Sequence, residues 1–346
     1  MREREGLAVL ERLGVDVGGL RVYALPMVER FRGITVREGV LLRGPAGWGE
    51  FCPFDDYGDR IAADWLATAL EAAVTGWPEP VRDRVPVNTT VPVVDPARAH
   101  QLVTASGCAT AKVKVADAPG TLDADLARVA AVREALGPSG AIRVDANAAW
   151  DVESAVAAIT ALDAAAGGLQ YVEQPCRTVP ELAEVRRRVG VPIAADESIR
   201  RAEDPLTVAV AGAADVAVIK CTPLGGVRRS LAVAAAAGLA CVVSSALESS
   251  VGLAAQLALA GALPGLDLAC GLGTGALMTG DVVAGADRLL PVDGCLPVPR
   301  RAPEPDPDRC RAHAADPQRQ AWWLDRLSRA ALLLDTTRPG PPRPGR

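Results

Sequence analysis

The sequence predicts an α/β protein in which a (β/α)8-type barrel follows a smaller N-terminal α+β domain. Two observations support this prediction: short apolar runs recur at regular intervals through the middle of the chain, and helical patterns fill the intervals. A crossover between parallel strands needs a helix, and a closed parallel sheet needs a covered outer face, so eight such units favour a barrel. A doubly wound parallel sheet is the alternative.

The eight apolar runs begin 23 to 30 positions apart along the chain. Between two of them, residues 123–136 place apolar side chains at i, i+3 and i+4 and stop at Gly137-Pro138, which is typical of an amphipathic helix. We expect the barrel to occupy residues 86–290. The runs begin at Val87, Ala111, Ala141, Leu169, Pro192, Asp215, Ala240 and Leu266.

The region before the barrel has a different pattern. Residues 33–44 and 47–50 are interrupted by glycine-containing turns, which indicates antiparallel strands, and an alanine-rich helix is expected over residues 61–75. These elements predict an α+β capping domain over residues 20–85. Residues 1–19, which contain no aromatic side chain, form a possible N-terminal extension outside the fold.

After residue 290 the chain becomes rich in Pro and Arg. One amphipathic helix is expected over residues 318–335, with Trp322 and Trp323 on or near its apolar face. We expect the C-terminal segment, residues 291–346, to pack back on the capping domain. It should end in a disordered Pro/Arg tail from about Arg338.

The amino-acid composition indicates which kinds of partner and which cell compartment suit this protein. With 346 residues, 49% hydrophobic content and a net charge of −5, the chain can bury a large core and is unsuited to nucleic acid. Its eight cysteines include no C-x-x-C pair, and no apolar segment follows the charged start, so reduced thiols and a cytoplasmic location are expected. The uncharged runs 231–247 and 249–266 are interrupted by Glu248 and Pro264, and they favour a buried helix and strand over a membrane span.

Lysine is rare in this chain. Its three lysines are Lys112, Lys114 and Lys220, although Lys and Arg together number 37. All three stand in or at the end of apolar runs, where a lysine is costly to bury unless it is paired or functional. Lysine, unlike arginine, can gain and lose a proton near neutral pH. These residues are therefore candidates for chemistry, with chance retention at exposed sites as the alternative.

Charged residues end five consecutive predicted strands, and the carboxyl ends of barrel strands carry the active site. Three carboxylates from adjacent strands would repel one another without a cation between them. Oxygen ligands without nearby His or Cys select Mg²⁺ or Mn²⁺. For each acidic residue alone, a helix N-cap is the alternative. The five residues are Lys114, the candidate metal ligands Asp145, Glu173 and Asp196, and then Lys220.

The strand positions also assign roles to the lysines. Lys112 and Lys114 are two residues apart on one strand, so both point into the barrel, with Lys114 nearer the mouth. Lys220 comes from a strand four places further round the ring. Two amines on opposite faces of a carboxylate substrate can each reach the proton on its α-carbon. Lys112 and the metal should depress the pKa of Lys114 toward neutrality, which suits a general base.

Five short motifs contain the charged residues of the predicted strand ends: Lys-x-Lys at 112–114, Asp-x-Asn at 145–147, Glu-Gln-Pro at 173–175, Ala-Asp-Glu-Ser at 195–198 and Ile-Lys-x-x-Pro-x-Gly-Gly at 219–226. Further motifs include Phe-Arg-Gly-Ile-Thr at 31–35, Gly-Trp-Gly-Glu-Phe at 47–51 and Val-Ser-Ser-Ala at 243–246. The first set resembles the enolase superfamily, muconate-lactonising subgroup. Within that subgroup, the further motifs resemble the actinobacterial type of o-succinylbenzoate synthase, and the likeness runs from about Leu20 to Pro299.

The resemblance implies an enolase-type modified (β/α)7β barrel with an N-terminal cap, and a hydro-lyase of menaquinone biosynthesis that uses Mg²⁺ or Mn²⁺. It implies that Lys114 removes the proton α to the carboxylate of 2-succinyl-6-hydroxy-2,4-cyclohexadiene-1-carboxylate and then protonates the departing hydroxide. Lys220 would stabilise the enediolate as a cation on the opposite face. The metal ligands would be Asp145, Glu173 and Asp196, with Lys112, Asn147, Ser244, Ser245 and Gly271 as supporting or substrate-binding residues.

Other functions remain open at this point. An N-acylamino acid racemase or dipeptide epimerase uses the same lysines and metal, although dipeptide epimerases commonly carry an Asp-x-Asp where this chain has residues 270–273, Cys-Gly-Leu-Gly. A Schiff-base aldolase with Lys220 as nucleophile leaves the carboxylates without a purpose. Residues 221–222 and 273–275 depart from the family pattern, so the placement of the substrate is open, as is the oligomeric state.

Arg32, in the capping domain, is our candidate for a contact between the cap and the substrate, with an ordinary surface arginine as the alternative. We predict that Arg32→Ala raises KM and leaves kcat nearly unchanged, because the barrel carries the chemical groups while the cap closes over the substrate. Steady-state kinetics of the purified variant measures both constants. A loss of folding stability with unchanged kinetics would count against this role.

Overall fold

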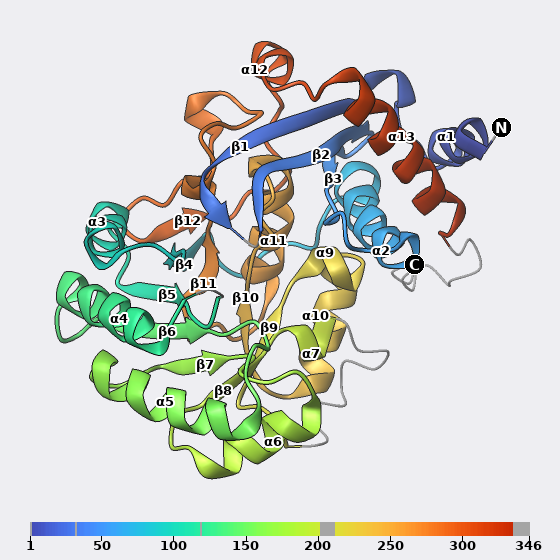
Figure 1. The fold of residues 1–346 in the computed structure, drawn as a ribbon. Coiled ribbons are helices and arrows are strands. Elements are labelled where there is room, and N and C mark those ends of the chain that lie inside the picture. Colours follow the sequence, from blue (N-terminus) through green and yellow to red (C-terminus); the bar gives the residue numbers. More distant parts are fainter. Residues whose placement is uncertain (1, 32, 118–119, 201–211, 335–346) are drawn as a thin grey trace.

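The computed structural model describes residues 2–31, 33–117, 120–200 and 212–334 (Figure 1). Within these residues, eight parallel strands form the barrel: β4 (Arg84–Val91), β5 (Thr110–Lys114), β6 (Ala141–Asp145), β7 (Tyr171–Glu173), β8 (Ile193–Ala195), β9 (Val216–Ile219), β10 (Ala240–Val243) and β11 (Cys270–Gly273). Strands β4 to β10 pair in chain order, β11 pairs with β4, and a parallel bridge from Ser244 to Gly271 joins the remaining edges. The barrel prediction is confirmed, although β11 begins four residues after Leu266.

Helices follow the first seven strands and cover the outside of the barrel (Figure 1). After β11 the described chain instead makes short 3-10 turns at Gly275–Leu277 and Gly285–Asp287, then enters β12 (Cys295–Pro297), which pairs antiparallel with β4. This is the (β/α)7β arrangement. The helices are α3 (Pro96–Ser106), α4 (Leu122–Leu136), α5 (Val152–Ala166), α6 (Val179–Arg188), α7 (Glu197–Arg200), α9 (Cys221–Leu224), α10 (Val227–Ala237) and α11 (Ser250–Ala262).

The uncharged runs 231–247 and 249–266 contribute α10, β10 and α11 to the barrel. Every residue of α11 from Ser250 to Gly261 is buried, which explains why nearly all of its side chains are apolar. In the described part of the chain, no helix has both the length and the apolar character needed to cross a membrane.

The capping domain begins with an antiparallel sheet of β1 (Arg21–Phe31), β2 (Ile34–Gly44) and β3 (Gly47–Phe51). It continues into α2 (Asp59–Leu70), whose last turn widens into a π-helical segment at Glu71–Thr75. Figure 1 shows this sheet above one end of the barrel, beside α11. The strands and the helix predicted for this region are therefore present.

The two ends of the described chain pack together. Helix α1 (Arg2–Arg12) lies against α13 (Pro317–Leu332), which also contacts α2 (Figure 1). The short helix α12 (Pro307–Ala312) precedes α13. Leu10 of α1 is completely buried, so this segment is packed into the molecule, where the sequence indicated a possible extension outside the fold. The expected tail from Arg338 lies outside the described residues.

Two carboxylates of the cap fix it to barrel helices. Glu50 of β3 is buried, and it accepts the backbone N–H groups of Ser249 and Gly252 at 3.1 and 3.0 Å at the start of α11. Tyr23 also donates its hydroxyl to Glu50, at 2.8 Å. Glu71 accepts the N–H of Val227 at the start of α10. A carboxylate at a helix N-terminus satisfies unpaired N–H groups and complements the helix dipole.

We predict that Glu50→Gln lowers the free energy of unfolding by about 2–4 kcal/mol, because the amide turns an N–H₂ group toward donors that need an acceptor. Urea unfolding of the purified variant measures this change. The matched control is Glu181→Gln, in the partly exposed capping box of α6, where about 1 kcal/mol or less is expected. Equal losses in the two variants would contradict the special role of Glu50.

Candidate active site

Five charged side chains stand at the carboxyl ends of neighbouring barrel strands. Lys114, Asp145 and Glu173 are the last residues of β5, β6 and β7, and the pairing register sets them side by side. Asp196 and Lys220 directly follow β8 and β9. All five residues are buried, with at most 9% of their surface exposed. The strands thus bring together the two amines and three carboxylates identified in the sequence.

Lys112 and Lys114 hold the carboxylates nearest to them. Lys112 Nζ lies 2.9 Å from Glu173 Oε1 and 3.0 Å from Asp145 Oδ2. Lys114 Nζ donates to the same Asp145 oxygen and to Oδ1 of Asn147, the latter at 2.7 Å. A buried carboxylate is strongly disfavoured as an ion unless a positive charge lies beside it, so these contacts favour the ionised forms of Asp145 and Glu173.

Lys220 donates to Asp196 on the other side of the rim. The backbone of Asp196 is held by Gln174, whose side-chain oxygen accepts the Asp196 N–H at 3.0 Å. The Gln174 amide also donates to Ser198 Oγ at 2.7 Å. Gln174, the residue after Glu173, therefore fixes the segment that carries Asp196. Sequence reasoning missed this role, although the Glu-Gln-Pro motif marked the position.

The surroundings distinguish the two lysines of β5. Burial lowers the pKa of Lys114, Asp145 opposes this, Lys112 reinforces it, and the resulting pKa lies below the ordinary lysine value. Burial also lowers the pKa of Lys112, but Asp145 and Glu173 outweigh it and the resulting pKa lies well above the ordinary value. A base is most effective when its pKa is near the working pH, so the site favours Lys114 as the base.

The carboxylates differ as well. Burial raises the pKa of Asp145, but Lys112 and Lys114 outweigh it and hold that pKa well below its usual range. Burial and the charge of Asp145 together raise the pKa of Glu173 above its usual range, despite the nearby Lys112. The positive charges of the lysines therefore do not fully stabilise the ionised form of Glu173. A further cation at the rim would favour that form.

The acidic residues fit a hard divalent cation by type and by place. Asp145, Glu173 and Asp196 offer only oxygen ligands, and they end neighbouring strands, which lie about 4.8 Å apart in a sheet. Among the described residues, no three His, Cys, Asp or Glu side chains are gathered closely enough to hold an ion as they stand. Each of these carboxylates instead faces a lysine.

A small cavity of about 30 Å³ lies between the rim and the cap. Ser245, on its wall, donates to Glu248 at 2.7 Å and accepts from Thr274 at 2.8 Å, so the segments after β10 and β11 are tied together. Sequence reasoning missed Glu248 and Thr274. Of the predicted residues, those that line the cavity are Lys112, Lys114, Asp145, Asn147, Asp196, Lys220, Ser244, Ser245 and Gly271.

The cap contributes Phe31 and Phe54 to this cavity. The centre of the Phe31 ring lies 5.4 Å from Lys114 Nζ, close enough for a cation–π interaction. Neither phenylalanine was singled out from the sequence, although Phe31 begins the Phe-Arg-Gly-Ile-Thr motif. Arg32, the predicted cap contact, lies outside the described residues.

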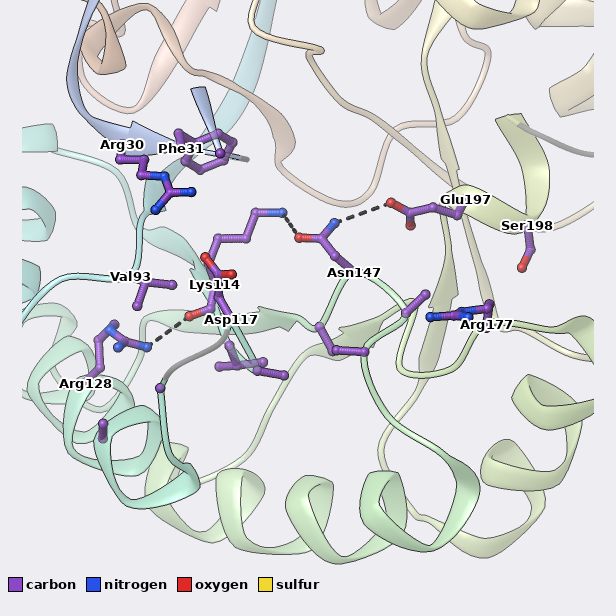
Figure 2. Close-up of a pocket in the computed structure, with 18 of the residues that line it drawn as sticks. Arg30, Phe31, Val93, Lys114, Asp117, Arg128, Asn147, Arg177, Glu197 and Ser198 are labelled. Atoms are coloured by element: carbon purple, nitrogen blue, oxygen red, sulfur yellow. Dashed lines mark hydrogen bonds between the residues drawn. The ribbon is translucent and has the colours of Figure 1, made fainter. Parts of the chain in front are cut away.

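An open cleft of about 1340 Å³ continues outward from the cavity. Phe31, Lys114 and Asn147 line both spaces. Figure 2 shows Lys114 in this cleft with its amine directed toward Asn147, which in turn donates to Glu197. Because the inner cavity has room for about one water molecule, the cleft is the space from which a larger molecule reaches Lys114.

Comparison with known proteins agrees with this fold. The model of the enolase C-terminal domain-like family matches residues 95–303, and that of the enolase N-terminal domain-like family matches residues 22–73. A muconate lactonizing enzyme from Pseudomonas fluorescens, solved with muconolactone, is 26% identical, with a TM-score of 0.71 over 86% of this chain and 98% of its own. The chain belongs to the enolase superfamily, whose enzymes use a divalent metal ion.

Closer relatives define its place within that superfamily. A protein of Thermobifida fusca named o-succinylbenzoate synthase is 58% identical over 93% of this chain and 99% of its own length. A protein of the same name from Mycobacterium ulcerans is 55% identical over 91% of this chain and 94% of its own. The chain is thus a member of the o-succinylbenzoate synthase family. An L-Ala-D/L-Glu epimerase from Bacillus subtilis, 23% identical with a TM-score of 0.69, shares the fold.

Proposed function

We propose that the chain is an o-succinylbenzoate synthase, a hydro-lyase that converts 2-succinyl-6-hydroxy-2,4-cyclohexadiene-1-carboxylate to 2-succinylbenzoate in menaquinone biosynthesis. The observation that carries this proposal is the placement of Lys114 and Lys220 on one cavity, four strands apart in a ring of eight, with carboxylates between them. The names of the relatives support the choice of substrate. We also propose a cytoplasmic location, in keeping with eight free cysteines.

The reaction requires one base to act twice on one face of the ring. Lys114 takes the proton α to the ring carboxylate, and the electrons of that C–H bond move toward the carboxylate. The C–O bond to the ring hydroxyl then breaks, Lys114 returns the proton to the departing hydroxide, and water and an aromatic ring result. Lys220 stabilises the developing negative charge from the opposite face. Asn147 holds the amine of Lys114 toward the cavity.

We propose that Asp145, Glu173 and Asp196 hold Mg²⁺, for which Mn²⁺ can substitute. A bound ion would neutralise the charge that builds on the substrate carboxylate. Lys112 lies beside Asp145 and Glu173 and favours the ionised form of both. We further propose the domain boundaries 20–85 for the cap, 86–290 for the barrel and 291–346 for the C-terminal segment, and that the substrate is a small carboxylate with no nucleic-acid or membrane partner.

The proposed function is tested by incubating the purified protein with Mg²⁺ and the cyclohexadiene substrate and following the loss of diene absorbance. Formation of 2-succinylbenzoate supports the proposal. If a folded, metal-loaded protein does not convert the substrate under these conditions, the proposed function is wrong.

We predict that EDTA abolishes the dehydration and that Mg²⁺ or Mn²⁺ restores it. Calorimetry should show one Mg²⁺ site in the wild type and strongly weakened binding in Glu173→Gln, because the amide removes one charged ligand. Glu181→Gln, on the outer helix α6, serves as the control and should bind Mg²⁺ as the wild type does. Full activity in the presence of EDTA would contradict the proposed role of the metal ion.

The lysines have separable roles in this reaction. We predict that Lys114→Ala lowers kcat by roughly 10²–10⁴-fold, because it removes general acid-base catalysis. Lys220→Arg keeps the positive charge but cannot transfer a proton at neutral pH, so it should retain measurable dehydration while losing any two-base racemisation of N-acylamino acids. Kinetics with both substrate classes measures this. If Lys220→Arg still racemises N-acylamino acids but no longer dehydrates the substrate, the roles assigned to the two lysines are wrong.

A further inference from the structure

The strand that carries the proposed base is held at its end by an ion pair on the following helix. Asp125 and Arg128, in the first two turns of α4, are 4% and 3% exposed, and Arg128 Nη1 lies 2.6 Å from Asp125 Oδ1. Neither residue lines the inner cavity, although Arg128 reaches the wall of the open cleft. Burying two charges costs desolvation energy that a surface salt bridge does not pay. Further hydrogen bonds from these two side chains must therefore offset that cost.

Both partners bond the backbone around Lys114. Arg128 Nη1 donates to the carbonyl oxygen of Lys114 itself at 3.0 Å, a bond visible in Figure 2. Asp125 Oδ2 accepts the backbone N–H of Ala116 at 2.8 Å. Arg128 Nε donates to the carbonyl oxygen of Val94, in the connection between β4 and α3, at 2.8 Å. The pair therefore ties together the ends of two neighbouring strands.

These bonds lie where the regular sheet ends. The last ladder bond on this side runs from Val115 N–H to Asp145 O at 3.1 Å. Ala116 then adopts a φ of 61°, a left-handed conformation that is unfavourable for a residue with a Cβ. A backbone in this conformation persists only where its surroundings hold it. The carboxylate of Asp125, which accepts the N–H of Ala116, is such a restraint.

We propose that Asp125 and Arg128 are positioning residues for Lys114. They fix the carbonyl of Lys114 and the N–H two residues later, and so set the direction in which its side chain leaves the strand. The long side chain of a lysine has several rotatable bonds, so a small rotation of its Cα moves its amine by a larger distance. Misplacement of a reacting group by about 1 Å can cost on the order of 100-fold in rate. This inference rests on the proposed function, in which Lys114 is the base.

The chemistry of the pair explains its residue types. A guanidinium presents donors in a fixed plane, so one arginine can serve Val94, Lys114 and Asp125 at once. A lysine in the same place has one ammonium group and cannot reach all three acceptors in fixed directions. Arg128→Lys should therefore preserve the charge but only part of the restraint.

The test compares Arg128→Ala, Arg128→Lys and Asp125→Asn with a matched control on the same helix. Arg133 also donates to backbone carbonyls, at 2.8 Å to Gly137 and 2.7 Å to Gly140, but these groups precede β6 at the amino end of the barrel. For each Mg²⁺-loaded variant, melting temperature, kcat and KM for the dehydration are measured, with kinetics below the lowest melting temperature.

We expect Arg128→Ala to lower kcat on the order of 10- to 100-fold with KM within about threefold of the wild type. Asp125→Asn and Arg128→Lys should show smaller losses in the same direction. The double variant with both Arg128→Ala and Asp125→Asn should be no worse than Arg128→Ala alone, because the two residues act as one unit. Arg133→Ala should lower the melting temperature and leave kcat within about twofold of the wild type.

The proposal is overturned if Arg128→Ala keeps the wild-type kcat, or if Arg133→Ala loses as much kcat as Arg128→Ala. If Arg128→Ala does not fold, Asp125→Asn and Arg128→Lys decide the question, and wild-type kcat in both of them overturns it. A wild-type protein without dehydration activity would be a failure of the proposed function rather than of this inference.

Discussion

Burial of charge at the mouth of the barrel is the constraint on which the rest of the structure depends. Three carboxylates end neighbouring strands almost without exposure to water. Such groups stay ionised only beside positive charge, and the strand register provides it by placing the three lysines of the chain among them. The same register that closes the barrel therefore also assembles the proposed catalytic groups, so folding and the proposed chemistry depend on one set of strand pairings.

Buried charged side chains also hold the cap to the barrel. Glu50 accepts backbone N–H groups at the start of α11, and the buried Arg37 donates to the carbonyl oxygens of Leu247 and Ala246, at 3.0 and 3.2 Å. The last two residues line the inner cavity. Bonds that dock the cap thus reach residues of the cavity wall directly, and a change in cap position must disturb that wall.

The barrel strands and the charged rim could be predicted because both depend on local pattern: apolar runs at a regular interval and a charged residue at the end of five consecutive runs. Contacts between distant segments left no such pattern. Arg37 and Leu247 are 210 positions apart, and nothing near either residue indicates the other. For the same reason the packing of α1 on α13, and the entry of Phe31 and Phe54 into the cavity, were not predicted.

Arginine and lysine perform different tasks in this protein. Buried or half-buried arginines bond several backbone carbonyls at once: Arg326 reaches Phe54 and Tyr57 at 2.7 and 2.6 Å, and Arg128 reaches Val94 and Lys114. A guanidinium suits this role because its donors are planar and its charge is permanent. Proton transfer needs the opposite property, an amine that can lose its charge. In the proposed reaction Lys114 uses that property, whereas Lys112, whose pKa lies well above the ordinary value, contributes its positive charge to the same rim.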